Sequence, residues 1–83
     1  MAIEREDVAR VVREWLRSHV TGDREVADDE LLIENGVLTS LQTVELVMFL
    51  DERFGIEVTE DEFVEENFQS VNAVARLVAS KGE

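Results

Sequence analysis

The chain has 83 residues, 45% of them hydrophobic, which is enough for one small domain with a modest core. Twenty acidic residues against eight basic ones give a formal net charge of −12, which repels nucleic acid and anionic membrane surfaces. No cysteine is present, so disulfides and thiolate metal sites are excluded. No signal peptide and no apolar run of membrane-spanning length is visible. We therefore expect a cytoplasmic protein without membrane insertion.

The first helix is predicted over residues 4–19. Its apolar residues follow the i, i+3, i+4, i+7, i+8 pattern of one buried helical face, at Val8, Val11, Val12, Trp15 and Leu16. We interpret the arginines between them as partners of neighbouring carboxylates, because the chain is strongly acidic. His19 is the only histidine and falls at the end of this helix, where a partial positive charge complements the helix dipole. We assign it no catalytic role.

A long connection over residues 21–38 begins with the turn signal Thr-Gly-Asp. We expect it to be ordered, because five of its residues can be buried: Val26, Leu31, Leu32, Ile33 and Val37. The connection is also rich in carboxylates, but it lacks the D-x-D-x-D-G spacing of a calcium loop, since Asp28 and not glycine is sixth from Asp23. We therefore predict a solvated acidic face and no metal site.

The central helix is predicted over residues 40–54. Thr39 and Gln42 form a T-x-x-Q capping box at its start, and Gly55 ends it. At about 100° per residue, one side of the helix collects the apolar residues that we expect in the core. These are Leu46, Val47, Leu50 and Phe54.

A second set of apolar residues runs down the same helix from Ser40, bordered by carboxylates. It consists of Leu41, Val44 and Met48, with Glu45, Asp51 and Glu52 beside them. A central helix that packs on two neighbours would bury these residues, whereas an exposed apolar strip with an acidic rim is typical of a docking surface. We predict the docking surface and call Leu41, Val44, Glu45, Met48 and Glu52 the docking strip.

Two shorter helices are predicted after the central one. Thr59 and Glu62 form a second capping box, which predicts a third helix over residues 60–66 with Phe63 as its core anchor. Ser70 can cap a last helix over residues 70–80, with a buried face of Val71, Val74, Ala75, Leu77 and Val78. The predicted fold is therefore an all-α four-helix bundle, in one domain over residues 1–83, with a long first loop and a short third helix.

Ser40 is the first residue of the predicted central helix. Because Thr39 caps that helix, the Ser40 hydroxyl has no capping role and lies beside the positive end of the helix dipole. Unpaired N–H groups at a helix start favour a phosphate. The setting suits a serine that carries a phosphodiester.

The run Thr39-Ser40-Leu41, with Gln-Thr-Val-Glu-Leu-Val-Met and Glu-Arg-Phe-Gly-Ile-Glu-Val after it, resembles the acyl carrier protein family, including its peptidyl and aminoacyl carrier relatives. The resemblance covers nearly the whole chain and is most specific over residues 36–58. It implies a free-standing carrier on which Ser40 receives the 4′-phosphopantetheine arm of coenzyme A. The thiol of that arm would hold an acyl or aminoacyl group as a thioester.

One position departs from the family motif, Asp-Ser-Leu, because Thr39 replaces the aspartate. Thr39 can still cap the helix, but it cannot supply a carboxylate to help hold the magnesium of the attaching enzyme. Apart from this departure, the resemblance implies a monomeric carrier. Such a carrier is not an enzyme but a covalent substrate of other enzymes. These partners are a phosphopantetheinyl transferase, an enzyme that loads the acyl or aminoacyl group, and a downstream synthase or transferase.

Two other functions compete with the carrier function. An acidic helical interaction module without a cofactor would use the docking strip alone, and the mass of the protein after incubation with coenzyme A and a transferase separates the two. A serine hydrolase is disfavoured, because the sequence around Ser40 is not G-x-S-x-G and His19 is the only histidine available as a base. The cargo stays open, although Gly-Val-Leu-Thr-Ser-Leu and Glu-Glu-Asn-Phe look more like carriers of specialised metabolism or amino-acid transfer.

Overall fold

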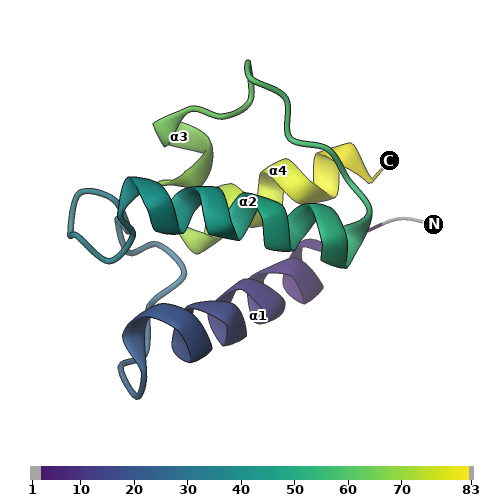
Figure 1. The fold of residues 1–83 in the computed structure, drawn as a ribbon. Helices are drawn as coiled ribbons and strands as arrows, with labels where there is room; N and C mark the ends of the chain where they lie inside the picture. The colour runs from purple at the N-terminus through teal and green to yellow at the C-terminus, as the bar shows by residue number, and fades with distance from the viewer. Residues whose placement is uncertain (1–2, 83) are drawn as a thin grey trace.

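Four α-helices and one π-helical turn make up the regular structure of residues 3–82, which the computed structural model describes. In chain order they are α1 (Arg5–Leu16), the π-helical turn η1 (Arg17–Thr21), α2 (Ser40–Phe54), α3 (Glu65–Phe68) and α4 (Val71–Lys81). The predicted all-α fold, with its long first loop and short third helix, is confirmed (Figure 1). Within residues 3–82, no helix combines the length and the apolar character needed to cross a bilayer.

The core lies where the apolar faces of α1, α2 and α4 meet. α1 packs along α4, and α2 passes in front of α4 in the view of Figure 1. Leu46 and Leu50 of α2 are fully buried, as predicted, and Val47 and Phe54 pack half-buried at the edge of the core. The other fully buried side chains are Val8, Val12, Leu16, Leu32, Phe68, Val71, Val74 and Val78.

The first helix ends in a wider turn than the periodicity predicted. α1 stops at Leu16, and the chain continues through Thr21 as a π-helical turn that ends at Gly22, where φ is +66°. His19 Nδ1 lies 3.1 Å from the Trp15 carbonyl oxygen, and its ring stacks on the Trp15 ring at a centroid distance of 5.1 Å. The helix-end position of His19 is therefore confirmed. Three arginines of α1 and η1 pair with carboxylates: Arg10 with Asp7 and Glu14, Arg13 with Asp28, and Arg17 with Glu25.

The long loop between η1 and α2 is tied to the bundle by burial and by backbone hydrogen bonds. Val26, Leu32 and Val37 are buried and Ile33 is half-buried, as predicted, whereas Leu31 is 39% exposed. The Leu32 N–H donates to the Gln69 carbonyl at 2.7 Å, and the Asn72 N–H donates to the Asp28 carbonyl at 3.0 Å. These bonds fix the loop against the start of α4.

The third helix was predicted at the wrong place. Residues 60–62 form a single turn after Thr59, Val64 is extended, and α3 covers only Glu65–Phe68. Glu62 does accept from the Thr59 N–H at 3.0 Å, but the Thr59 hydroxyl donates to the same carboxylate and does not cap a helix. Lys81 of α4 also donates to Glu62, at 2.7 Å. A partner distant in sequence therefore holds this segment as a turn.

The shift of the third helix also changes which phenylalanine anchors it. Phe63 is 42% exposed, so its prediction as a core anchor was wrong, and Phe68 is buried with 1% exposure. The two rings lie 5.6 Å apart in a tilted arrangement. The extended backbone at Val64 moves the helical turn toward α4, and this lets Phe68 reach the core.

Candidate functional site

The predicted capping box is present at the start of α2. Thr39 Oγ1 accepts from the Gln42 N–H at 3.1 Å, and Gln42 Oε1 accepts from the Thr39 N–H at 3.0 Å. The Thr43 hydroxyl donates to the Thr39 carbonyl at 2.9 Å and reinforces the first turn from its buried side. Thr39 is therefore the helix cap, and Ser40 is the first helical residue, as the sequence predicted.

The hydroxyl of Ser40 is available for chemistry. Ser40 is exposed, and within residues 3–82 its side chain makes no hydrogen bond. A helix leaves its first four N–H groups without partners inside the helix, and the capping box satisfies those of Thr39 and Gln42. The N–H groups of Ser40 and Leu41 remain at the positive end of the helix dipole. A phosphodiester on Ser40 Oγ would meet both of them, so the residues present fit such a group.

Ser40 lines a groove of about 250 Å³ between α2 and the segment that leads into α3. Its α2 side carries Ser40 and Val44, and its opposite side carries Phe63, Val64 and Glu65. The buried members of the lining are Leu38, Thr43 and Phe68. Glu65 is the only titratable residue in this lining, and within residues 3–82 no hydrogen bond joins its carboxylate to the Ser40 hydroxyl.

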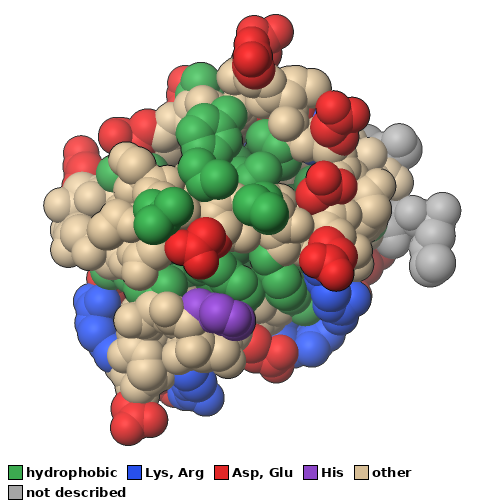
Figure 2. All heavy atoms as spheres, viewed as in Figure 1, with side chains coloured by type: hydrophobic (Ala, Val, Ile, Leu, Met, Phe, Trp, Pro, Cys, Tyr) green, Lys and Arg blue, Asp and Glu red, His purple; other side chains and the backbone are tan. Residues whose placement is uncertain are grey.

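The docking strip is exposed. Leu41 is 70% exposed, Met48 66% and Val44 43%, and the carboxylates of Glu45 and Glu52 also lie at the surface. Figure 2 shows apolar side chains gathered over α2 and toward α3, with acidic side chains around them and basic ones only in the lower half of the view. The strip is therefore free of the two-neighbour packing that would have buried it.

Phe63 and Val64 extend this apolar surface across the groove, although neither residue was predicted as part of the site. They are 42% and 41% exposed and face Val44 across the groove beside Ser40. The sequence did hold a signal. Phe63 and Val64 are adjacent apolar residues inside an acidic run, and neighbours on a helix point about 100° apart, so one short helix could not bury both.

Glu62 fixes the loop that carries these two residues. Hydrogen bonds from Lys81, and then from the Thr59 N–H, lower the pKa of the Glu62 carboxyl below its ordinary value. The Asn67 side chain donates to the Glu62 carbonyl at 2.8 Å. Phe63 and Val64 are therefore held at their place beside Ser40 by contacts on both sides of the loop.

Comparison with known proteins agrees with this geometry. The model of the family described as "Phosphopantetheine attachment site" matches residues 6–78. A D-alanyl carrier protein of Streptococcus suis (strain 98HAH33) is 34% identical over 70 residues, which are 84% of each chain. An acyl carrier protein of Buchnera aphidicola subsp. Baizongia pistaciae (strain Bp) is 34% identical over 56 residues, 68% of this chain and 69% of that protein.

A further relative matches a shorter stretch of the chain at higher identity. A D-alanyl carrier protein of Streptococcus suis (strain 05ZYH33) is 44% identical over 46 residues, 55% of this chain and 58% of that protein. The family match spans more than half of the chain and includes Ser40 and the groove beside it. The chain therefore belongs to the phosphopantetheine attachment family, and it is a carrier that holds acyl or aminoacyl groups on phosphopantetheine.

Proposed function

We propose that Ser40 is the residue that carries the phosphopantetheine arm. The observation that supports it is the exposed hydroxyl of Ser40 at the start of α2, which, like the N–H groups of Ser40 and Leu41 beside it, has no hydrogen-bond partner within residues 3–82. The other serines lack this setting. Ser70 is buried and accepts from the Ala73 N–H, the Ser80 hydroxyl donates to the Leu77 carbonyl, and Ser18 lies in η1.

The attachment step makes a bond between Ser40 Oγ and phosphorus, while the bond to the nucleotide part of coenzyme A breaks and the hydroxyl proton leaves. Within residues 3–82 no base is hydrogen-bonded to the Ser40 hydroxyl, so we expect the attaching enzyme to supply the base together with the magnesium ion. The bound arm contributes a thiol that holds the cargo as a thioester. The chain itself orients Ser40 and offers a surface. It acts as a covalent substrate and not as an enzyme.

The docking strip is the surface on which we place the partner enzymes. These are a phosphopantetheinyl transferase, a loading enzyme and a downstream synthase or transferase. Leu41 and Met48 lie on the helix face that begins at Ser40, so an enzyme that reaches the root of the arm covers them. Apolar contact supplies affinity there, and Glu45 and Glu52 attract basic partners. The monomeric state and the cytoplasmic location expected from the sequence remain predictions.

The cargo that we favour is a small aminoacyl group. Two of the relatives are named D-alanyl carrier proteins. The groove beside Ser40 is small, at about 250 Å³, which favours a compact cargo. Glu65 at its edge places a carboxylate where the ammonium group of an aminoacyl thioester can lie.

Intact-mass measurement tests the attachment, and NMR tests the cargo. Incubation with coenzyme A and a transferase of broad specificity should add the mass of one arm, and fragmentation should place it on Ser40. The holo form is then charged with a D-alanyl or a hexadecanoyl group. The D-alanyl group should shift amide signals only around the groove, near Val44 and Glu65. Shifts of Leu46 in the core with the long chain would contradict the small cargo.

A further inference from the structure

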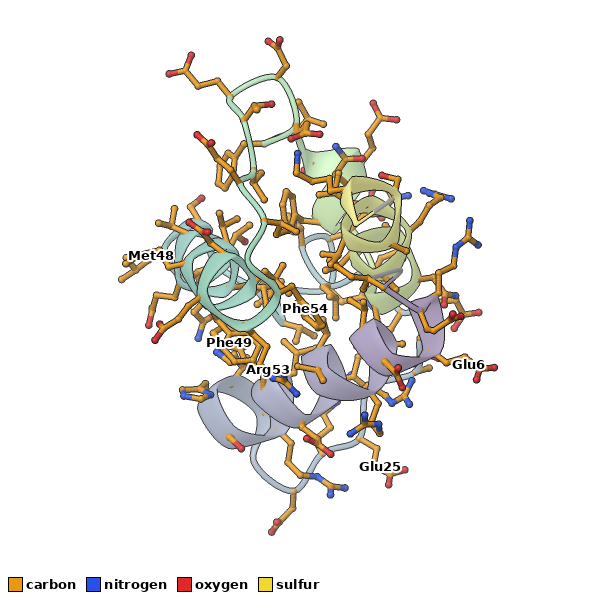
Figure 3. All side chains as sticks on the ribbon, turned by 90° about the vertical axis from the view of Figure 1, so that its right-hand side faces the viewer. Glu6, Glu25, Met48, Phe49, Arg53 and Phe54 are labelled. Atoms are coloured by element: carbon orange, nitrogen blue, oxygen red, sulfur yellow. The ribbon has the colours of Figure 1, made fainter. Side chains whose placement is uncertain are left out.

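Six of the eight basic residues line two adjoining grooves. No residue of the docking strip lines either groove. The larger groove, of about 810 Å³, lies between α1 and α4 and includes Arg5, Arg10, Arg13 and Arg76. The smaller one, of about 310 Å³, shares Arg10 and Arg13 and adds Arg17 and Arg24. Figure 3 places Glu6, which lines the larger groove, on the side of the molecule opposite Met48.

Two arginines of the larger groove have no carboxylate partner within residues 3–82. Arg13 Nη1 lies 2.6 Å from Asp28 Oδ1, and Arg10 pairs loosely with Asp7 at 3.6 Å. Arg5 and Arg76 make no ion pair in that part of the chain. They come from different helices and are brought to one groove by the packing of α1 on α4. Both guanidinium groups are therefore available to an outside carboxylate.

The shape of the groove suits a helix. Two of its lining residues, Ala9 of α1 and Ala75 of α4, are small and buried, so they form a floor with little bulk. Its wall at Asp28 is fixed, because Asp28 accepts from Arg13 and from the Asn72 N–H. A helix laid between two others brings small or apolar residues to the floor and charged residues to the walls. Arginines on the walls match carboxylates on the incoming helix.

We propose that this α1–α4 groove binds an acidic helical segment of a partner protein. The net charge of the chain does not forbid it. The groove lining carries four arginines against the carboxylates of Glu6, Asp7 and Asp28, and Asp7 and Asp28 already pair with Arg10 and Arg13. The lining therefore keeps a positive excess, while charges beyond the Debye length of about 8 Å are screened. The groove and the docking strip lie on opposite sides of the molecule. One partner can therefore hold the carrier through the groove while an enzyme works at Ser40. The proposal does not depend on which residue carries the arm.

A peptide titration tests the groove. The probe is an amidated helical peptide built of glutamate and alanine, added to the isotope-labelled full chain, with the lysine version of the same peptide as the control. The glutamate peptide should shift the amide signals of Ala9 and Ala75 but not that of Met48, and added salt should weaken its binding. Absence of shifts at the groove, or equal shifts with the lysine peptide, would overturn the proposal.

Charge reversal provides a matched pair of variants. Arg76→Glu and Arg53→Glu change the net charge equally, but only Arg76 lines the groove. Arg76→Glu should weaken peptide binding about threefold or more, the range expected from loss and reversal of an exposed ion pair, whereas Arg53→Glu should have a smaller effect. Equal weakening would mean that only overall charge matters and would refute the groove. Circular dichroism checks folding, and Arg5→Glu is the second groove variant.

The same titration separates a protein partner from a membrane surface. Vesicles of anionic phosphatidylglycerol carry negative charge without a helix that could fill the groove. We expect them to leave the signals of Ala9 and Ala75 unchanged. Vesicles that shift these signals, together with a peptide that does not, would assign the groove to a membrane surface and overturn the acidic-helix proposal.

Discussion

Lys81 Nζ lies 2.7 Å from Glu62 Oε1 and joins the last turn of α4 to the loop that carries Phe63 and Val64. Both side chains are partly buried, with 19% and 29% exposure. The ion pair holds this loop against α4, although the sequence of the loop has no helical or strand periodicity. It therefore connects the stability of α4 with the shape of the groove beside Ser40.

Glu62→Gln should make the protein less stable at neutral pH, with the difference fading in acid. The folded-state pKa of Glu62 is lowered, so its contribution is present above the unfolded-state pKa and is lost as the pH falls through the folded-state pKa. Thermal unfolding of both proteins from neutral to acidic pH measures this. Glu60→Gln, in the same loop, is the control. An equal loss of stability at every pH would show that the carboxylate charge is irrelevant.

Thr39→Ala should destabilise the protein by about 0.5 to 2 kcal/mol, because the Gln42 N–H loses its acceptor. Thr39→Asp keeps a capping oxygen and restores the residue usual in carrier proteins, so it should unfold like the wild type and be modified at least as fast. Denaturant titration and transfer rates with several transferases measure these effects. Slower modification of Thr39→Asp by all of them would mean that the hydroxyl itself is needed.

Met48→Ala should change stability by no more than about 0.5 kcal/mol, since Met48 is 66% exposed. Leu46→Ala, two positions away and fully buried, should cost about 2 to 5 kcal/mol. Met48→Ala should nevertheless slow transfer by the partner enzymes. A lower unfolding midpoint for Met48→Ala, with normal partner kinetics at low temperature, would place Met48 in the core and refute the docking strip.

Glu45→Lys should slow association with the transferase more than Glu14→Lys does. The two substitutions change the net charge equally, but Glu45 lies on α2 beside the strip and Glu14 lies on α1. Carboxylates at the rim of an interface act mainly on the association rate, so the difference should shrink at high salt. Stopped-flow measurement at two salt concentrations tests this. Identical rates for the two variants would exclude a steering role for Glu45.

Local signals were enough to predict α2 from end to end. Thr39, Gln42 and Gly55 act within one turn of the helix ends, so their side chains and backbone dihedrals decide the boundaries without help from the rest of the chain. The prediction of the third helix failed because a contact distant in sequence decides the structure there. Glu62 looks like a capping residue, but Lys81, 19 residues further on, holds it in a turn. No local pattern could have revealed that contact.

The candidate site was predictable in part. The helical period places Leu41, Val44 and Met48 together, but whether a neighbour covers them depends on where α1 and α3 lie. The groove beside Ser40 was not predictable, because Phe63 and Val64 reach it through a loop whose path depends on Glu62. The arginine groove likewise needs Arg5 and Arg76, which only the packing of α1 on α4 brings together.

Ser40 alone should carry the arm, and the Ser40→Ala variant shows whether it does. Thr39 supplies the cap, so the helical circular dichroism of the variant should match that of the wild type. Ser18→Ala, at another exposed serine, is the matched control. After incubation with coenzyme A and a transferase, intact-mass measurement should show one added arm on the wild type and on Ser18→Ala, and none on Ser40→Ala. An added arm on a folded Ser40→Ala variant would contradict the claim.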